Sequence, residues 1–417
     1  MSKIEIPSIR FRGFDDAWEQ RKLGDVVKEI TRNAPESEAP IMMITANNGF
    51  IEQSERYAFN NAGESLKKYI LLKKGELAYN HGASKLRPYG SCFALTTAEN
   101  ARIPFVYHCF SAGNQNAEFM SIELNGIEIE NQLRKIVSSG ARMDGLLNIS
   151  FDEYTSVSVL LPSTEEQDRI ADFFRQLDNL ITLHQVKFEK LTNVKKSMLE
   201  KMFPQNGSCY PAVRFKGFTD PWEQRKLGEV IRLNGRIGFR GYTEKDIVSK
   251  DDGGVLTFSP SNIVDNKLTT NCKNTYITRF KYDESPEIKI HNGDILFVKT
   301  GSTLGKSALV TGLSEDATLN PQVVVMRANN LNARFLAALL VTKSITSQVN
   351  LAKIGGAVPT LTETRIKDFD VTIPVSEAEK EQIGQFFSQL DNLITLHQRE
   401  LEKLQSIKKS LLEKVFI

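Results

Sequence analysis

The segment whose spacing comes nearest to known chemistry is Gly301–Ser307, which reads GSTLGKS and is similar to a phosphate-binding loop. Such a loop needs four residues between its glycines and a helix after it, because backbone N–H groups and the helix N-terminus together hold the phosphate. Here three residues separate the glycines, Thr300 stands where the first glycine is needed, and the residues through Asp316 are typical of a strand and a turn. The segment therefore does not predict a nucleoside triphosphate site.

Other catalytic signatures are weaker still. Asn320-Pro321-Gln322 is similar to the Asn-Pro-Pro-aromatic motif of amino methyltransferases, but it lacks the second proline and the aromatic residue. A Gly-x-Ser-x-Gly motif is absent. The five histidines and four cysteines show no paired metal-ligand spacing, and reduced thiols are the simplest interpretation of the cysteines. We expect no catalytic centre, no metal site and no cofactor in this chain.

Loops that mix basic, hydroxyl, amide and glycine residues remain as candidates for binding chemistry. Backbone N–H groups, hydroxyls and cations suit phosphates, and Arg, Asn and Lys suit the edges of bases. Ordinary solvated turns are the alternative for any single residue. Binding is favoured because Gly75-Glu76-Leu77 and Gly293-Asp294-Ile295 precede two of the loops in corresponding places. The candidate DNA contacts are Asn80, His81, Ser84, Lys85, Arg87, Tyr89 and Arg142 in the first half, and Arg236, Arg240, Tyr242, Lys299, Thr300, Ser302, Thr303 and Lys306 in the second.

The segments expected to position these loops form internal sequence repeats, each present in two copies. A short block, Pro7–Gly24, matches Pro211–Gly228 at 13 of 18 positions. A long block, Ser163–Phe203, matches Ser376–Phe416 at 25 of 41 positions, and its octet DNLITLHQ is identical in both copies. The intervening residues 25–160 and 229–373 share only scattered features. This pattern indicates one shared task performed twice, beside two versions of a related task.

The long block is predicted to be a helix in both copies. Ser163-x-x-Glu166 and Ser376-x-x-Glu379 are capping boxes, in which the glutamate is expected to reach back to the serine N–H. The apolar residues alternate spacings of four and three, which predicts two helices of about 60 Å that pair as an antiparallel coiled coil about a pseudo-twofold axis. Histidines in the seam are interpreted as polar residues that set the register. The expected seam contains Ile170, Phe174, Leu177, Ile181, His184, Ile383, Phe387, Leu390, Ile394 and His397.

The variable segments are predicted to be mixed α/β domains. Short β-branched runs punctuated by glycine and asparagine predict strands, and amphipathic runs predict helices at 127–137 and 333–349. The fold class is α+β: two mixed domains separated by two long helices. Expected strands lie at 41–44, 69–72, 90–96, 155–161, 255–259, 294–299, 322–327 and 370–373, and the expected bounds of the parts are 1–162, 163–204, 205–375 and 376–417.

Composition narrows the class of protein. The chain has 417 residues, of which 41% are hydrophobic and 25% charged, as in globular proteins. A net charge of +2, from 53 Lys+Arg and 51 Asp+Glu, excludes a strongly basic tail but not local basic surface. No apolar run reaches the length of a membrane span, and the polar start is no signal peptide. We expect a cytoplasmic protein.

The whole chain resembles the specificity subunits of type I restriction-modification systems. The resemblance rests on the two PxxRFxGFxxxWEQRKLG blocks, the helix starts Glu165–Ile170 and Glu379–Ile383, the strand Gly293–Phe297 and, above all, the duplicated layout. The second helix start lacks the arginine of the first, Arg169. The resemblance implies two target recognition domains that each read one half of a split DNA sequence, and two conserved antiparallel helices that fix the gap between the halves.

The resemblance also implies the partners. Beside double-stranded DNA, these are two methylase (M) subunits that carry S-adenosylmethionine and methylate adenine N6, and two restriction (R) subunits with an ATP-driven translocase and a nuclease. S-adenosylmethionine, ATP and Mg belong to the partners; this chain would hold no cofactor, perform no chemistry and contact no membrane. Two alternatives stay open: a stand-alone, repressor-like pseudo-dimeric DNA-binding protein, and a scaffold that organises other proteins.

Overall fold

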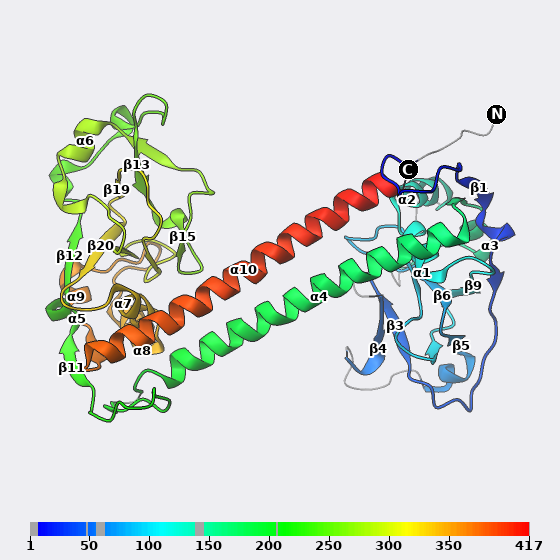
Figure 1. Ribbon diagram of the computed structural model, residues 1–417, viewed down its shortest axis with the longest axis horizontal. Helices are drawn as coiled ribbons and strands as arrows, with labels where there is room; N and C mark the ends of the chain where they lie inside the picture. Colours follow the sequence, from blue (N-terminus) through cyan, green and yellow to red (C-terminus); the bar gives the residue numbers. More distant parts are fainter. Residues whose placement is uncertain (1–6, 47–48, 56–62, 138–145, 206, 417) are drawn as a thin grey trace. The chain divides into compact units, whose positions relative to one another are not determined.

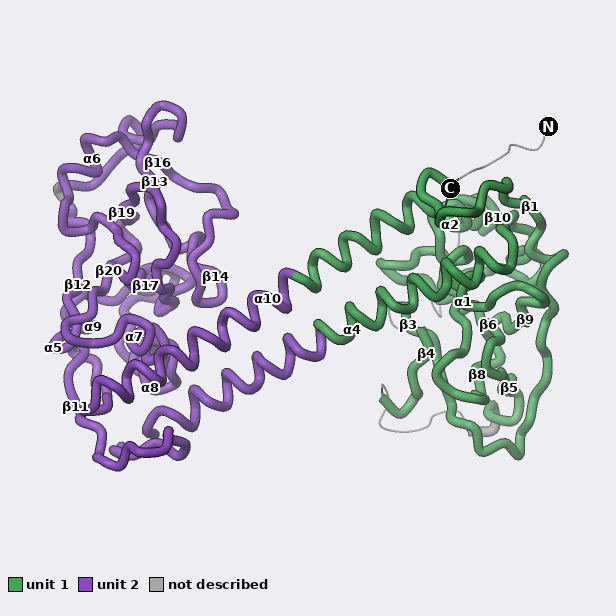
Figure 2. The backbone as a smooth tube through the Cα atoms, in the orientation of Figure 1, with its two compact units in different colours: residues 1–184, 400–417 green, residues 185–399 purple. Residues whose placement is uncertain are grey.

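The structure is a computed structural model that describes residues 7–46, 49–55, 63–137, 146–205 and 207–416. The chain forms two compact units, one of residues 1–184 with 400–417 and one of residues 185–399 (Figure 2). Each unit contains one short block, one variable domain and part of both long helices. The division between the units thus falls within the helices, whereas the sequence suggested the helices as segments of their own.

The long blocks form helices α4 (Thr164–Lys201) and α10 (Glu377–Val415), of 38 and 39 residues (Figure 1). Ser163 and Ser376 stand before them, and their hydroxyls accept hydrogen bonds from the backbone N–H groups of Glu166 (3.3 Å) and Glu379 (3.4 Å), as expected of capping boxes. The glutamate carboxylates do not complete the boxes. They bind the arginine of a short block instead, Arg10 in one unit and Arg214 in the other.

In the unit of residues 1–184 and 400–417, the short block pairs with the end of the variable domain. Strand β1 (Glu19–Lys22) runs antiparallel to β10 (Ser158–Leu161). A four-stranded sheet has the order β2-β9-β6-β7. Its strands are β2 (Lys28–Glu29), β9 (His108–Ser111), β6 (Glu76–Asn80) and β7 (Ser91–Ala94). Two further strand pairs are β3 (Met42–Thr45) with β4 (Gly49–Glu52), and β5 (Ile70–Lys73) with β8 (Asn100–Ile103). The short helices are α1 (Ala117–Glu123), α2 (Ile127–Ile136) and α3 (Phe151–Thr155).

The unit of residues 185–399 has the same plan. Strand β11 (Glu223–Lys226) runs antiparallel to β21 (Asp370–Ile373), and a four-stranded sheet has the order β12-β20-β17-β18. Its strands are β12 (Ile231–Gly235), β20 (Val323–Ala328), β17 (Ile295–Val298) and β18 (Ser307–Leu309). The remaining elements are the sheet β16 (Thr275–Ile277), β13 (Val255–Phe258) and β19 (Ala317–Leu319), the hairpin β14 (Ile263–Val264) and β15 (Lys267–Leu268), and helices α5 (Leu227–Val230), α6 (Arg279–Asp283), α7 (Ala333–Leu340), α8 (Lys343–Ala352) and α9 (Glu363–Lys367).

The mixed α/β character and most predicted strands agree with the structure, but one predicted helix is wrong. Residues 333–349 were expected to form one helix, whereas α7 ends at Leu340, α8 begins at Lys343, and the two axes differ by 60°. The buried Thr342 explains the break, because its hydroxyl donates to the Leu339 carbonyl at 2.7 Å and so satisfies one of the last carbonyls of α7. Among the described residues no single helix has the length and apolarity of a membrane span, although α7 and α8 together pass that test as a bent pair.

The short blocks are fastened to helix ends in the same way in both units. Trp222 lies edge-on to Phe203, after the end of α4, with ring centroids 5.9 Å apart. Trp18 lies edge-on to Phe416, after the end of α10, at 6.0 Å. Each block also donates a backbone hydrogen bond to its helix end, from Val213 to Lys201 and from Ile9 to Lys414. The end of the chain thereby packs against its first short block.

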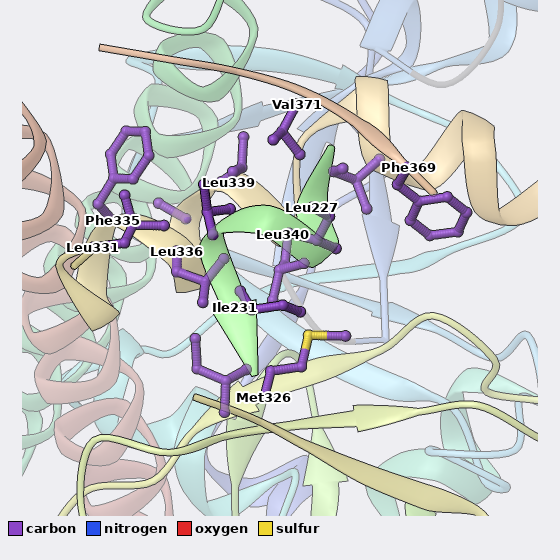
Figure 3. Close-up of a cluster of buried hydrophobic side chains, with 14 of the residues drawn as sticks. Leu227, Ile231, Met326, Leu331, Phe335, Leu336, Leu339, Leu340, Phe369 and Val371 are labelled. Carbon is purple, nitrogen blue, oxygen red and sulfur yellow. The ribbon is translucent and has the colours of Figure 1, made fainter. Parts of the chain in front are cut away.

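Two apolar clusters form the core of each unit. Figure 3 shows part of the core of residues 185–399, where Leu227 of α5 and Ile231 of β12 lie against Leu336 and Leu339 of α7. The cluster continues to Ile383, Phe387 and Leu390 of α10. In the other unit, the corresponding cluster contains Ile170, Phe174 and Leu177 of α4. These seam residues therefore fasten a helix to its own domain.

Candidate nucleic-acid interface

The two best candidate loops are hairpin loops at the same place in two equivalent sheets. Residues 81–90 join β6 to β7, and residues 299–306 join β17 to β18. Gly75 and Gly293 begin the two hairpins with φ of 82° and 95°, a left-handed backbone that favours glycine. Their N–H groups donate to Leu95 and Val310 across the hairpin. The correspondence expected from the two Gly-acid-apolar triplets is present in the structure.

The tip of the first hairpin loop presents Lys85 and Leu86. Ser84 and Arg87 close a turn below them, with Ser84 N–H donating to Arg87 O and Arg87 N–H to Ser84 Oγ, both at 3.0 Å. Lys85 is exposed, and Leu86 is 64% exposed. Arg87 is half-buried and donates to the Asn125 carbonyl at 2.7 Å, and burial lowers the pKa of its guanidinium. Arg87 therefore anchors the loop, and Lys85 is its outward cation.

The other candidates of this loop hold its base. His81 is buried, with Nδ1 2.8 Å from the Leu147 carbonyl and Nε2 2.6 Å from the Val106 carbonyl. Asn80 uses both ends of its amide, donating to Ile44 O and accepting from Gly82 N–H. The Tyr89 carbonyl accepts the Tyr79 hydroxyl at 2.6 Å. These contacts shape the loop, while Arg142 lies outside the described residues.

The second hairpin loop presents Ser302 and Lys306. Both side chains are exposed, and Lys306 N–H donates to Thr303 O to close the turn. At the base, Lys299 Nζ forms an ion pair with Glu363 at 3.1 Å. Thr300 Oγ1 lies 3.3 Å from Thr360 Oγ1. The outward groups are therefore one cation and one hydroxyl, and Lys299 is already paired.

The arginines of the segment Arg236–Tyr242 form contacts within their own domain. Arg236 is buried, donates to the Leu319 carbonyl at 3.0 Å and lies 5.4 Å from the centre of the Tyr242 ring; burial lowers its pKa. Arg240 forms an ion pair with Glu287 at 3.3 Å. Neither guanidinium is offered freely to a ligand in this structure, which gives both arginines an internal role that the sequence did not predict.

A chain of hydrogen bonds connects Tyr242 to the second hairpin. Its hydroxyl accepts from the Asn320 amide at 3.0 Å, and the Asn320 side-chain oxygen accepts from Gln322 N–H at 2.8 Å. The Gln322 carbonyl accepts from Lys299 N–H at 2.9 Å. The segment Asn320-Pro321-Gln322 is thus the turn between β19 and β20.

A further loop reaches the second hairpin, and the sequence reasoning missed it. Leu361 N–H donates to the Lys299 carbonyl at 2.8 Å, as Leu147 N–H donates to the His81 carbonyl at 2.9 Å in the other unit. Before Leu361, residues 353–360 form a loop closed by two 2.9 Å backbone bonds between Ile354 and Thr360. The loop exposes Lys353, and leaves Ile354 50% and Val358 61% exposed.

The available signal for this loop was a shared dipeptide. Gly140-Ala141 follows the predicted helix of the first domain, and Gly356-Ala357 follows that of the second. In residues 185–399 the hairpin loop and the 353–360 loop together offer cations, hydroxyls and apolar side chains. Such groups can contact phosphates, base edges and the methyl group of thymine. Among the described residues no three His, Cys, Asp or Glu side chains are grouped to hold a metal ion.

The long helices carry matching contacts in the two units. Lys195 of α4 pairs with Asp391 of α10 at 2.6 Å, and Lys408 of α10 pairs with Asp178 of α4 at 2.5 Å. Asp391 and Lys408 each lie 213 positions after Asp178 and Lys195. Of the other predicted seam residues, Ile394 is buried, and Ile181, His184 and His397 are half-buried.

Comparison with known proteins shows which proteins this chain is similar to. Residues 219–406 match the family model described as type I restriction modification DNA specificity domain. The MjaVIII specificity subunit, a type I restriction enzyme component of Methanocaldococcus jannaschii, is 22% identical over 284 residues, which span 66% of this chain and 65% of that relative. The type I restriction-modification S subunit of M. genitalium has a similar fold, with a TM-score of 0.60, 12% identity and coverage of 99% of both chains. The resemblance to type I specificity subunits is thereby confirmed.

Proposed function

We propose that this chain, which is similar to type I specificity subunits, is a non-catalytic subunit that reads a two-part DNA sequence for a restriction-modification complex. Each variable domain would read one half of the target. The observation that carries this proposal is the pair of equivalent hairpin loops, residues 81–90 and 299–306, which emerge from sheets of the same strand order but differ in sequence. Equivalent sheets that carry loops of different sequence are suited to two domains that recognise different bases.

The outward residues suggest how each reader binds. Lys85 and Lys306 would contact phosphates, which position the protein without specifying sequence. Ser302, Thr303 and the exposed apolar residues Ile354 and Val358 are suited to base edges and thymine methyls in the major groove. The 353–360 loop thus joins the 299–306 hairpin in reading one half-site. Asn80, His81, Arg87 and Arg236 would act by holding loops in shape.

We further propose that α4 and α10 pair antiparallel along their seams and set the distance between the half-sites. The two ion pairs support this, because Asp178–Lys408 and Asp391–Lys195 exchange places under a twofold operation that interchanges the helices. Inserting four residues into α4 alone tests the idea. Methylation is expected to be lost or to move to a target of different spacing; an unaltered target would contradict the spacer role.

The methylase subunits would dock on the outer face of the helices. Leu180 and Leu183 of α4 and their repeats Leu393 and Leu396 of α10 are large apolar side chains exposed on the surface. Paired exposed patches of one sequence suit two copies of one partner, which agrees with two M subunits. Two R subunits would join this cytoplasmic assembly, and S-adenosylmethionine, ATP and Mg would be held by these partners.

The function is tested by mapping N6-methyladenine across a host genome with single-molecule sequencing. The chain is produced with its neighbouring methylase, and a matched strain produces the methylase alone. A split motif that appears only with this chain is the expected result. If the methylase is folded and present but methylation does not depend on this chain, the proposed function is wrong.

A further inference from the structure

We propose that the cleft between the second variable domain and the long helices, within residues 185–399, binds a phosphate group. The cleft has a volume of about 430 Å³. Its walls come from the β14–β15 hairpin, the turn after β18, the start of α7, and one face of α10 with Lys195 of α4. A cavity of this size suits a small ligand, since ligand pockets commonly measure about 300–1,000 Å³.

The charges that line the cleft do not balance. Three cations line it, Lys195, Lys267 and Arg334, against the single carboxylate of Asp391. Asp391 is already paired with Lys195 at 2.6 Å. Among the described residues, neither Lys267 nor Arg334 takes part in an ion pair. Among the described residues, the cleft therefore holds two cations that form no direct ion pair with a carboxylate.

Of the two cations, Lys267 gives the stronger evidence for an anion site. The β14–β15 turn carries it against α10, where Nζ donates to the hydroxyl of Thr395 and lies 3.5 Å from the Asp391 carbonyl. Burial lowers its pKa, which means that the charged ammonium is short of solvation in this place. Among the nearby charges, the carboxylates of Asp391 and Asp265 raise this pKa, and the cations Lys195 and Arg399 lower it.

Neutral donors complete the lining. The hydroxyls of Thr270, Thr311 and Ser388 and the amide of Asn392 come from three sides of the cleft. Hydroxyl, amide and ammonium groups, together with a guanidinium, are the donors that phosphate oxygens accept, and charge-assisted bonds of this kind are the strong ones. A carboxylate ligand would use fewer of them. The donor set therefore favours phosphate.

The other unit contains the same cleft without this excess of charge, which makes it an internal comparison. It has a volume of about 670 Å³ and lies between the first variable domain and the helices. Glu118, the second residue of α1, stands where Arg334 is the second residue of α7. Glu118 pairs at 3.1 Å with Arg175, whose repeat is Ser388.

The charges of this second cleft cancel. Four cations line it against four carboxylates, namely Arg87, Arg175, Lys408 and Lys409 against Glu118, Glu130, Asp178 and Glu413. One copy of the architecture thus closes its cleft with an ion pair between variable domain and helix. In the cleft of residues 185–399, Arg334 stands in place of Glu118, Ser388 stands in place of Arg175, and Lys267 is an additional cation. These changes are the ones expected of an anion site.

Titration calorimetry of the full chain with inorganic phosphate, and then with a nucleoside triphosphate, tests the proposal. The wild type is expected to bind saturably, and Lys267→Ala and Arg334→Ala to bind about tenfold more weakly or worse, because each loses a hydrogen bond to a charged group. Arg334→Glu copies the sign of the other cleft and is expected to abolish binding. Arg334 is exposed, so its variants should fold; circular dichroism checks this. Lys343→Ala removes an exposed cation of α8 outside the cleft and should bind as the wild type does.

A DNA arm separates the two sources of phosphate and does not require the DNA-reading role. If a free small molecule supplies the phosphate, excess duplex leaves the calorimetric binding unchanged. If the DNA backbone supplies it, duplex displaces the phosphate, and the Lys267 and Arg334 variants lower the salt dependence of DNA binding. The proposal is overturned if neither probe binds saturably and these variants leave that salt dependence unchanged, or if all variants bind phosphate as well as the wild type does.

Discussion

Arg214 and Glu379 form a two-bond ion pair, in which Nε and Nη2 of the arginine donate to Oε1 and Oε2 of the carboxylate at 2.6 and 2.8 Å. The glutamate side chain is 1% exposed and the arginine 15%. Arg10 and Glu166 repeat the pair in the other unit at 2.7 and 2.7 Å. The arginine of each short block therefore holds the first turn of a long helix, which explains why both segments recur together.

Replacing Glu379 by glutamine is expected to destabilise the unit of residues 185–399. Arg214 would keep its buried charge without a carboxylate, and losing one partner of a buried pair costs about 3–5 kcal/mol. Urea unfolding measures the loss. Glu381→Gln, an exposed glutamate of the same helix, is the control and should change stability by less than about 0.5 kcal/mol. Equal effects of the two substitutions would contradict the structural role of the pair.

Replacing Gly384 by alanine is expected to lower stability although alanine favours a helix. A Cβ at Gly384 would lie 2.7 Å from the backbone N of Phe335 and 2.8 Å from Asn332 Oδ1. Such overpacking costs about 1–3 kcal/mol, more than the gain in helix propensity of about 1 kcal/mol. Ala171 occupies the repeated position in α4. A higher melting temperature for Gly384→Ala would show that α7 does not approach α10 this closely.

Buried Glu123 makes the stability of its unit depend on pH. Burial raises the pKa of its carboxyl from 4.5 to about 7, partly opposed by a hydrogen bond from Leu160 N–H. The folded state thus binds the proton more tightly, so its stabilising effect is complete below about pH 4.5 and is lost as pH rises toward 7. Glu123→Gln is expected to remove this fall, on the order of 2–3 kcal/mol, in urea unfolding at pH 5 and pH 8. Glu413→Gln, which is exposed, should keep it; a wild type whose stability does not decline over that range would refute the prediction.

Replacing Lys85 or Lys306 by alanine should weaken DNA binding by the assembled methylase. Each lysine is exposed at a hairpin loop and would lose one phosphate contact, so the slope of log affinity against log salt should fall by about 0.9 for each. Fluorescence anisotropy over a range of salt concentrations measures this. Lys343→Ala, an exposed lysine of α8, serves as the control. Wild-type affinity and slope for both loop variants would remove these lysines from the interface.

Local sequence signals predicted the regular elements well. The strand expected at 370–373 is β21, and the helix expected from Ser376 onward is α10, because alternation and heptad spacing are properties of the element itself. The break at Thr342 was missed, since it depends on one buried hydroxyl bonding Leu339. Glu166 was assigned to a capping box, but its true partner, Arg10, lies 156 positions away in sequence.

The site was predicted in outline but not residue by residue. The two hairpin loops were found because glycine and acid mark their starts. The 353–360 loop was missed because only the backbone bond from Leu361 to Lys299 brings it to the hairpin. Arg236 was expected to contact DNA because of its charge, but it donates to the Leu319 carbonyl in the domain interior. Composition identifies cations, and tertiary structure decides which of them remain available.

Exchanging one variable domain tests most directly whether each domain reads one half-site. Residues 229–373 are replaced by the corresponding segment of another type I specificity subunit, the rest of the chain is kept, and N6-methyladenine is mapped genome-wide beside the native chain. The expected result is a split motif in which one half is retained and the other is new. A motif that changes in both halves, or in neither while methylation persists, would contradict the assignment of one half-site to each domain.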